Sequence, residues 1–345
     1  MKTLIQLIAG ARPNFMKIAP IIKELERENI HYELIHTGQH YDEEMSGVFF
    51  DDLGIPEPDH YLGIGSASHA VQTAKIMMEY EKIIIERKPD LVIVVGDVNS
   101  TIACALVAKK LFIDVAHVEA GLRSFDRRMP EEINRVLTDQ ISDLLFTTEK
   151  SAKANLKKEG IDENKIFFVG NIMIDTFVEN IEKAKKLNPL KKFNLEKENY
   201  AVITLHRPSN VDRLEDLKKM IRIIRYIQDK INLFFPIHPR TEKNLKKFNL
   251  YDTLKTENIA LTEPVGYLEF LNLMMNSRFI LTDSGGIQEE ASYLQIPVLT
   301  LRKNTERPIT IEQGTNVLVG KNFSKIKEKV EEIINGKFKQ GTQIR

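Results

Sequence analysis

The sequence lacks several features that would place the protein in a specialised class. Its 345 residues include one cysteine, Cys104, so no disulfide can form within the chain, and the apolar stretch around it indicates a buried, reduced thiol. Lysine plus arginine and aspartate plus glutamate both number 49, and no basic block indicates a nucleic-acid partner. No apolar run approaches the roughly 20 residues that span a bilayer. These absences favour a soluble, cytoplasmic protein with neither nucleic acid nor membrane as a partner.

Cofactor and metal motifs are also missing. Neither half carries G-x-G-x-x-G after its first strand-like run, which argues against nicotinamide or flavin, and the Walker A loop of ATPases is absent. There is no H-E-x-x-H. His36 and His40 have the spacing of a helical metal pair, but Gly38 lies between them in an expected loop. We therefore expect no cofactor and no metal.

Short apolar runs instead alternate with longer helical patterns, which is typical of parallel α/β folds. The length favours two domains. The predicted strands lie in TLIQLIAG, HYELIHTG, LVIVVGD, DVAHVEAG, LLFTTE and KIFFVGN, and then in YAVITLHR, INLFFPIH, NIALTEP, RFILTD, PVLTLR and TNVLVG. Between these sets the chain turns polar and lysine-rich. We predict an α/β protein of two Rossmann-like parallel-sheet domains facing a cleft, residues 1–172 and 173–345.

The stretch DSGGIQEE, which starts at Asp283, predicts an anion-binding turn. A strand ends at its aspartate, the serine and glycines turn the chain, and a helix is expected to start at about Ile287. The free N–H groups and positive dipole end of such a helix favour a phosphate. Glu290, one turn along, could accept hydrogen bonds from ribose hydroxyls. The alternative is a simple helix cap with glycines for turning.

Six motifs in order carry a resemblance to a known family: GARPNFMKIAP, TGQHYDEEM, GDVNST, HVEAGLRSFDRRMPEEINR, LHRPSNVD and DSGGIQEEA. With TERP at Thr305 to Pro308, they resemble the non-hydrolysing UDP-N-acetylglucosamine (UDP-GlcNAc) 2-epimerases over nearly the whole chain. The resemblance implies a glycosyltransferase-B type fold, usually a homodimer. It also implies an isomerase of polysaccharide biosynthesis that interconverts UDP-GlcNAc and UDP-N-acetylmannosamine (UDP-ManNAc) without nicotinamide.

The resemblance further implies roles for individual residues. The catalytic set is Arg12, Lys17, Asp97, Glu119, Glu131 and His206. The UDP-binding set is Arg12, His206, His238, Phe270, Ser284, Gly285, Gly286, Glu290 and Arg307, with Phe270 beside the uracil. Gln39 and His40 match the region where bacterial members bind a second, activating UDP-GlcNAc.

Sugar chemistry supports the same roles. The proton on C2 is not acidic, so inversion is easier if the C1–O bond breaks first and UDP leaves a 2-acetamidoglucal. Charge then builds on the departing phosphate, where Arg12, His206 and the amides of the DSGG turn could stabilise it. Moving the C2 proton requires an acid and a base, for which Asp97, Glu119 and Glu131 are candidates. The sequence leaves open which of them takes the proton.

Each carboxylate also has a purely structural interpretation. Asp97 could be a capping acid at a helix start. Glu119 could form a buried pair with Arg123. One of Glu131 and Glu132 is expected only to complement the helix dipole.

Other positions leave further alternatives open. His206 and His238 could be core histidines, and Asn14, Val98 and Asn99 depart from residues common in the family. The chain stops at GKFKQGTQIR, where members usually continue into a last helix, so we expect that closing helix to be missing.

Two other function classes compete with the epimerase. A hydrolysing epimerase or a UDP-sugar-dependent glycosyltransferase would use the same scaffold, and would differ by irreversible UDP release or by dependence on an acceptor. A non-catalytic UDP-sugar-binding regulator would be indifferent to loss of Asp97, Glu119 or Glu131.

Overall fold

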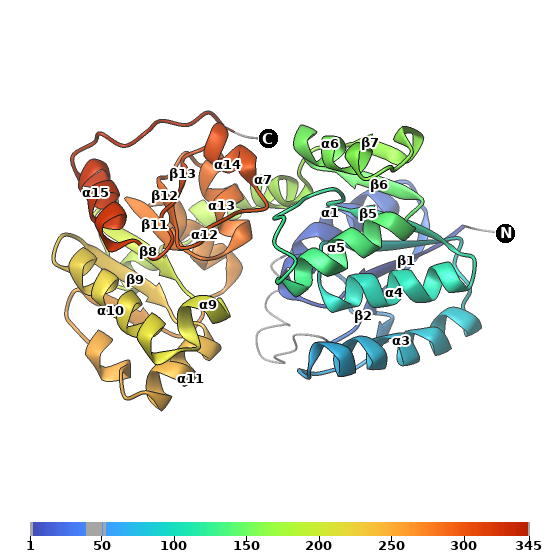
Figure 1. Ribbon diagram of the computed structural model, residues 1–345, viewed down its shortest axis with the longest axis horizontal. Helices are drawn as coiled ribbons and strands as arrows, with labels where there is room; N and C mark the ends of the chain where they lie inside the picture. The colour runs from blue at the N-terminus through green and yellow to red at the C-terminus, as the bar shows by residue number, and fades with distance from the viewer. Residues whose placement is uncertain (1–2, 39–49, 51–52, 344–345) are drawn as a thin grey trace. The chain divides into compact units, whose positions relative to one another are not determined.

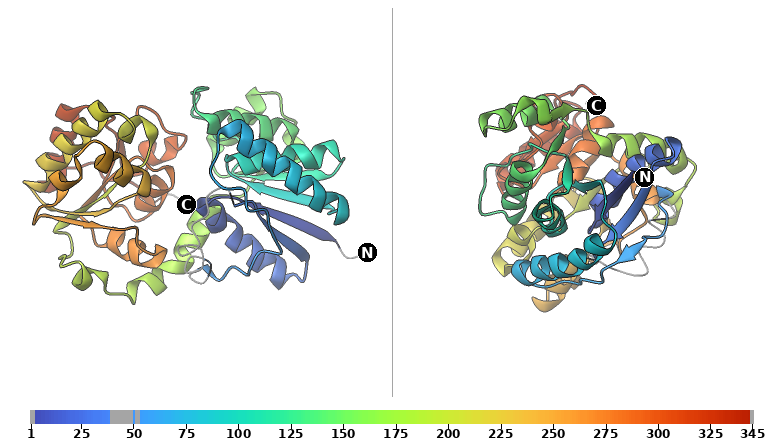
Figure 2. Two further views of the ribbon diagram at one scale, coloured as in Figure 1. Left: turned by 90° about the horizontal axis from the view of Figure 1, so that it is seen from below. Right: turned by 90° about the vertical axis from the view of Figure 1, so that its right-hand side faces the viewer.

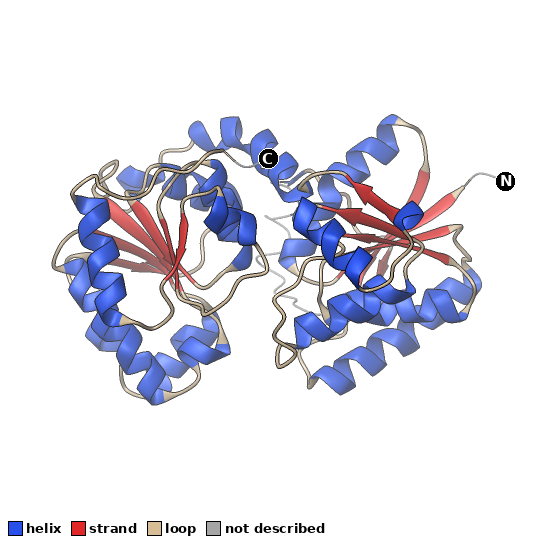
Figure 3. Ribbon diagram, turned by 45° about the horizontal axis from the view of Figure 1, so that its top comes forward, coloured by secondary structure: helices blue, strands red, loops and turns tan. Residues whose placement is uncertain are grey.

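The structure is a computed structural model that describes residues 3–38, 50 and 53–343, apart from the side chain of Arg12. The chain divides into two compact units, Met1–Thr176 and Phe177–Arg345 (Figure 1). The division falls inside helix α7 (Ile172–Lys185). Each unit is an α/β layer structure, with helices on both faces of a sheet (Figure 3).

Unit 1 contains a seven-stranded, fully parallel sheet in the order β3-β2-β1-β4-β5-β6-β7. Its strands are β1 (Leu4–Ala9), β2 (His31–His36), β3 (His60–Tyr61), β4 (Leu91–Val95), β5 (Asp114–Val118), β6 (Leu144–Thr147) and β7 (Ile166–Phe168). Its helices are α1 (Arg12–Arg27), α3 (His69–Glu86), α4 (Asn99–Lys110), α5 (Pro130–Ile141), α6 (Lys150–Lys158) and the 3-10 turn η1 (Glu163–Lys165). Helix α3 packs on α4 and α4 on α5, and the views in Figures 1 and 2 show α3 and α4 side by side.

Unit 2 contains a six-stranded, fully parallel sheet in the order β10-β9-β8-β11-β12-β13. Its strands are β8 (Tyr200–Thr204), β9 (Asn232–Pro236), β10 (Ile259–Thr262), β11 (Phe279–Thr282), β12 (Val298–Thr300) and β13 (Asn316–Leu318). Its helices are α8 (Pro189–Lys192), α9 (Pro208–Val211), α10 (Leu214–Gln228), α11 (Pro239–Lys247), η2 (Tyr251–Leu254), α12 (Tyr267–Met275), α13 (Gly285–Tyr293), α14 (Pro308–Glu312) and α15 (Phe323–Ile334).

The strands are apolar on both faces because helices cover both sides of each sheet. In unit 1, Val92 and Val94 of β4 join a buried cluster with Ile76 and Ile84 of α3. In unit 2, Phe279 and Leu281 of β11 are fully buried in a cluster that also receives α10 and α15. None of the described helices combines the length and the apolar character needed to cross a membrane.

The predicted α/β class and the two Rossmann-like parallel sheets are confirmed, and each predicted strand is present. The two-residue strand β3 was not predicted, because two residues are too few to show a period. In each sheet the strand order reverses once, between β1 and β4 and between β8 and β11. Ligands of open parallel sheets bind outside the carboxyl ends of strands at such reversal points, so the loops after these four strands are where a ligand site is expected.

Candidate active site

The turn after β1 is held by Asn14, the first of the departures from the family pattern. Its Oδ1 accepts the backbone N–H of Gly10 at 3.1 Å and of Ala11 at 3.0 Å, and its Nδ2 donates to the carbonyl of Val95 at 3.2 Å. Arg12 opens α1 in this turn, and its side chain lies outside the described part of the chain. The N–H groups of this turn are therefore used by the protein itself, which ties β1 to β4.

Lys17 and Glu119 form a buried ion pair in unit 1. Lys17 Nζ donates to Glu119 Oε2, and the two residues are 7% and 3% exposed. The backbone of Glu119 has φ +71°, a left-handed conformation that is costly for a non-glycine residue and is common at functional sites. The predicted alternative of a Glu119–Arg123 pair is wrong, because Arg123 binds Asp139 and Glu159 instead.

Asp97 follows β4 and is paired with Arg135 of α5. Arg135 also donates to Glu132, and its side chain is only 3% exposed. Glu132 in turn accepts the backbone N–H groups of Ser124 at 2.9 Å and Phe125 at 2.9 Å. Asp97 is thus held by an ion pair in addition to any role in the turn before α4.

The two adjacent glutamates at the start of α5 differ in burial and in hydrogen bonding. Glu132 is 2% exposed and organises the preceding loop, whereas Glu131 is half-buried and its carboxylate forms no hydrogen bond or ion pair with the described residues. The residue with only a structural role is therefore Glu132. Glu131 keeps a carboxylate that a ligand could use.

In unit 2, Asp283 follows β11 and organises the loop after β8. Its buried carboxylate accepts the backbone N–H groups of His206 at 3.1 Å and Arg207 at 3.0 Å, and Asn210 Nδ2 at 2.9 Å. His206 Nδ1 lies 2.8 Å from Asp283 Oδ1. Burial raises the pKa of Asp283, but the bond and charge of His206 outweigh it, so the pKa lies below its usual value.

Helix α13 begins at Gly285, two residues earlier than predicted, with Ser284 as its N-cap. The glycines therefore form the first helical turn. A side chain at Gly285 would place its Cβ 2.8 Å from Glu306 Oε1. Glu306 accepts Arg302 Nη1 at 3.1 Å and Arg302 Nη2 at 2.5 Å, and lies 3.9 Å from Arg207. A side chain at Gly285 would therefore require the Glu306 carboxylate to shift away from the start of the helix.

These arginines keep Glu306 ionised in a buried place. Burial opposes ionisation, but the charge of Arg302, followed by those of Arg207 and Arg307, holds the pKa of Glu306 well below its ordinary value. Arg307, from the TERP motif, is 8% exposed and its Nε lies 3.0 Å from Glu289 Oε1. The guanidinium groups of Arg302 and Arg307 are thus ion-paired with Glu306 and Glu289. The feature of this region that suits a phosphate is the N-terminal end of α13 itself.

Glu290 is 4% exposed, and Tyr267 Oη donates to its Oε1 at 3.5 Å. Burial, followed by the charge of Glu289, raises the pKa of Glu290 to about 8, which the Tyr267 bond lowers only in part. The pKa shift therefore favours the protonated form of Glu290. The sequence alone indicated a polar residue that accepts hydrogen bonds, not its protonation state.

The remaining predicted residues are scattered. His238 is an exposed N-cap of α11, whose Nδ1 accepts Arg240 N–H at 3.1 Å, and its ring lies 5.4 Å from that of half-buried His206. Neither histidine is a core residue. Phe270 is half-buried in the first turn of α12. Gln39 and His40 lie outside the described residues.

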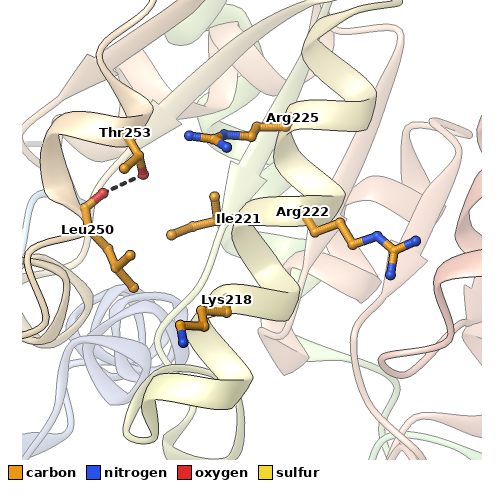
Figure 4. Close-up of a pocket in the computed structure, with 6 residues that line it drawn as sticks. All are labelled: Lys218, Ile221, Arg222, Arg225, Leu250 and Thr253. Carbon is orange, nitrogen blue, oxygen red and sulfur yellow. Dashed lines mark hydrogen bonds between the residues drawn. The ribbon is translucent and has the colours of Figure 1, made fainter.

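A shallow pocket lies elsewhere, between α10 and η2 (Figure 4). Its lining residues are Lys218, Ile221, Arg222, Arg225, Leu250 and Thr253. None of the predicted site residues lines it. In the part of the chain that the structure describes, no group of three or more His, Cys, Asp and Glu side chains could hold a metal ion.

The structure brings together Lys17 with Glu119 in unit 1, and His206 with the DSGG turn in unit 2. The sequence analysis missed the buried residues that pair with groups around the predicted site, chiefly Arg135, Asp139 and Glu306. A weak signal existed for Arg135, which stands three residues after Glu132 on a helix. No spacing rule could have paired it with Asp97.

Comparison with known proteins gives a consistent result. The profile of a family described as UDP-N-acetylglucosamine 2-epimerase matches residues 23–344. The UDP-N-acetylglucosamine 2-epimerase of Methanocaldococcus jannaschii is 52% identical over 340 residues, 96% of this chain and 93% of the relative. The UDP-2,3-diacetamido-2,3-dideoxy-D-glucuronate 2-epimerase of Pseudomonas aeruginosa is 42% identical, over 91% of this chain and 87% of the relative.

A solved structure agrees with these sequence relatives. The M. jannaschii UDP-GlcNAc 2-epimerase in complex with UDP-GlcNAc and UDP superposes with a TM-score of 0.94 at 50% identity. The match covers 99% of this chain and 96% of that structure. On the family match and the identity to its relatives, this chain belongs to the UDP-N-acetylglucosamine 2-epimerase family.

Proposed function

We propose that this protein is a non-hydrolysing UDP-GlcNAc 2-epimerase that reversibly converts UDP-GlcNAc to UDP-ManNAc. The observation that carries the proposal is the set of polar residues that follow the strands at and beside the strand-order reversal in each sheet. In unit 1, Asp97 follows β4, and Lys17 of the helix after β1 pairs with Glu119, which follows the neighbouring strand β5. In unit 2, His206 follows β8, and the phosphate-compatible start of α13 follows β11. The M. jannaschii relative, crystallised with UDP-GlcNAc and UDP, supports the choice of nucleotide sugar.

In the proposed mechanism UDP is the leaving group. The C1–O bond breaks first, a carboxylate then removes the proton from C2, and a C1–C2 double bond forms in the resulting 2-acetamidoglucal. UDP departs as the anion, stabilised by the N–H groups of α13 and by His206. An acid then returns a proton to the opposite face of C2 while UDP oxygen adds again to C1. Asp97, Glu119 and Glu131 are the proposed acid and base groups.

Binding roles follow for unit 2. Ser284, Gly285 and Gly286 present the start of α13 to the diphosphate, and Arg307 adds positive charge beside it. Phe270 is proposed to lie by the uracil, and Glu290 to accept the ribose hydroxyls. His238 is proposed to assist His206, whose ring it adjoins. Activation of this protein by a second UDP-GlcNAc through Gln39 and His40, its cytoplasmic location and its place in polysaccharide biosynthesis stay predictions.

The deciding experiment is an NMR time course of the protein with UDP-GlcNAc in deuterated water, without nicotinamide or acceptor. Appearance of UDP-ManNAc with deuterium at C2 would support the proposal. Free sugar with UDP would indicate the hydrolysing reaction. UDP-2,3-diacetamido-2,3-dideoxy-D-glucuronate should be assayed in parallel, because the P. aeruginosa relative is named for that substrate. A clear preference for it would move the assignment to that substrate while keeping the C2 chemistry.

The protonation of Glu290 predicts a pH dependence of UDP binding. Ribose hydroxyls donate more strongly to an ionised carboxylate than to a neutral acid, so UDP should bind less tightly as pH falls below the pKa of about 8. Each pH unit below it should weaken affinity by up to about tenfold. The Glu290→Gln variant should lose this dependence, as measured by calorimetric titration of UDP across pH. A slope that persists in Glu290→Gln would exclude Glu290 as its origin.

The raised pKa of Glu290 also predicts how the unfolding free energy of the protein depends on pH. The folded pKa of Glu290 lies above its ordinary 4.5, so the folded state binds the proton more tightly than the unfolded state. The resulting stabilisation is complete below about pH 4.5 and is lost as pH rises through about 8. Relative to wild type, Glu290→Gln should therefore gain up to about 1.4 kcal/mol of unfolding free energy per pH unit in this window. Denaturant unfolding near the two ends of the window checks the sign.

We propose that the protein is a homodimer that pairs through the α3–α5 layer of unit 1. Val71, Met78 and Ile85 of α3 are 46%, 63% and 65% exposed at seven-residue spacing, and Ile133 and Leu137 of α5 are also exposed. Such a stripe is typical of a helix that buries a second face against a partner.

Met78→Glu should therefore shift the mass measured by light scattering toward the monomer, because it would bury an unpaired charge. Lys243→Glu, an exposed change on α11 of unit 2, serves as the control. A wild-type protein that is monomeric at micromolar concentration would contradict the proposal.

A further inference from the structure

His117 is a histidine of β5 with no exposed surface, and the proposed chemistry does not use it. Its Nδ1 lies 2.7 Å from Asp139 Oδ1. Its Nε2 lies 2.7 Å from the backbone carbonyl oxygen of Gly96. Both ring nitrogens therefore have a hydrogen-bond partner inside the core.

The first partner, Asp139, can only accept. Its second oxygen already accepts the backbone N–H of Gly121 at 3.0 Å, and Arg123 Nη2 lies 2.7 Å away. The Gly121 N–H and the Arg123 guanidinium converge on this oxygen, which favours the ionised carboxylate. Asp139 therefore presents its other oxygen to His117 as an acceptor.

The second partner, a backbone carbonyl, can never donate. Two acceptors facing one imidazole require a proton on each ring nitrogen, which makes His117 an imidazolium. A neutral ring would leave either the Gly96 carbonyl or an oxygen of Asp139 without its donor in the core, which is unfavourable because a buried acceptor then has no partner. The buried positive charge is compensated by Asp139 at contact distance.

We propose that His117, held as an imidazolium by Asp139, is a positioning residue that fixes the turn carrying the catalytic acid Asp97. Gly96 directly precedes Asp97 and has φ +69°, and its carbonyl orientation is set by His117 Nε2. Without that donor the peptide between Gly96 and Asp97 could rotate, and the carboxylate would move with it.

Asp139 also holds the turn that follows Glu119, the second proposed acid or base. It accepts the N–H of Gly121, two residues after Glu119, in a turn where Glu119 itself has φ +71°. One buried residue of α5 thereby anchors the loops after β4 and β5 together. Two other charged groups near this pair have partners of their own. Arg123 also forms an ion pair with Glu159, and Lys17 forms an ion pair with Glu119.

NMR of the full chain with isotope-labelled histidine tests the charge state directly. We expect both ring nitrogens of His117 to carry hydrogens near neutral pH, with the signals assigned by their loss in His117→Gln. A ring with one unprotonated nitrogen would overturn the proposal. This measurement needs neither substrate nor turnover.

Asp139→Asn gives a second test if His117→Gln does not fold. The amide oxygen must face the Gly121 and Arg123 donors, so its NH₂ group must face His117 Nδ1. His117 Nδ1 would then have to accept a hydrogen bond from this NH₂ group. The imidazole should therefore become the neutral tautomer that carries its hydrogen on Nε2. An unchanged pattern of ring hydrogens would show that Asp139 does not set the state of His117.

Kinetics test the positioning role. His117→Gln should lower kcat about 10- to 100-fold with KM changed by no more than about threefold, assayed well below the variant's own unfolding temperature. His31→Gln, an exposed histidine at the start of β2, is the matched control and should leave kcat unchanged. A His117→Gln protein that is less stable but retains wild-type kcat would reduce His117 to a structural residue.

The kinetic test of the positioning role rests on the proposed function, whereas the NMR test of the charge state of His117 does not. If wild type shows no epimerisation, the proposed function fails, and the imidazolium is still decided by NMR. If wild type is active and the imidazolium is absent, the present inference fails alone.

Discussion

Glu119→Gln should lower kcat by about 10²–10⁴-fold, the range expected when a general acid or base is removed. The amide has the shape of the carboxylate but cannot take up a proton from the sugar. Lys17 would keep an acceptor in the amide oxygen, so its buried side chain is not left without a partner. UDP affinity should stay within about tenfold, because removing an interaction used only in the transition state leaves ground-state binding largely intact.

The measurement is initial-rate kinetics together with calorimetric titration of UDP. Glu24→Gln, which removes an exposed carboxylate paired with Arg27 on α1, is the matched control and should leave both parameters unchanged. Asp97→Asn should behave as Glu119→Gln does, since Arg135 would keep a neutral acceptor. If both amide variants lose UDP binding rather than turnover, the catalytic assignment of these acids is wrong.

Gly285→Val should weaken UDP binding about 10- to 100-fold, equivalent to about 1.4–2.8 kcal/mol. The new Cβ would stand 2.8 Å from Glu306 Oε1, and the branched side chain would displace that carboxylate from Arg302. The same side chain would cover the first N–H groups of α13, which are proposed to receive the diphosphate. Both effects act on the ground-state complex, so affinity for UDP alone reports them.

Gly65→Val is the matched control for this change. A Cβ at Gly65 meets no atom within 4 Å, and its backbone does not require positive φ. Circular dichroism of both variants would establish that the fold is retained. Undiminished UDP affinity of a folded Gly285→Val protein would refute the proposed phosphate site at α13.

Sequence patterns located the candidate residues correctly at strand ends but could not supply their partners. The glutamate in HVEAG was recognisable because a charge at the end of an apolar strand needs compensation. The expected partner was nearby Arg123, whereas the actual partner is Lys17, 102 residues away. Local spacing favours near neighbours, and the order β1-β4-β5 in the sheet favours this distant one.

The sequence by itself determined the two parallel sheets, the positions of the loops that carry polar residues, and the family. These depend on apolar periodicity and on short motifs, which are local properties of the chain. Only the tertiary structure decided which glutamate of α5 is structural, that burial raises the pKa of Glu290, and that His117 faces two acceptors. Each of these depends on burial and on partners brought together by strand order, because a charge's state is set by what surrounds it in space.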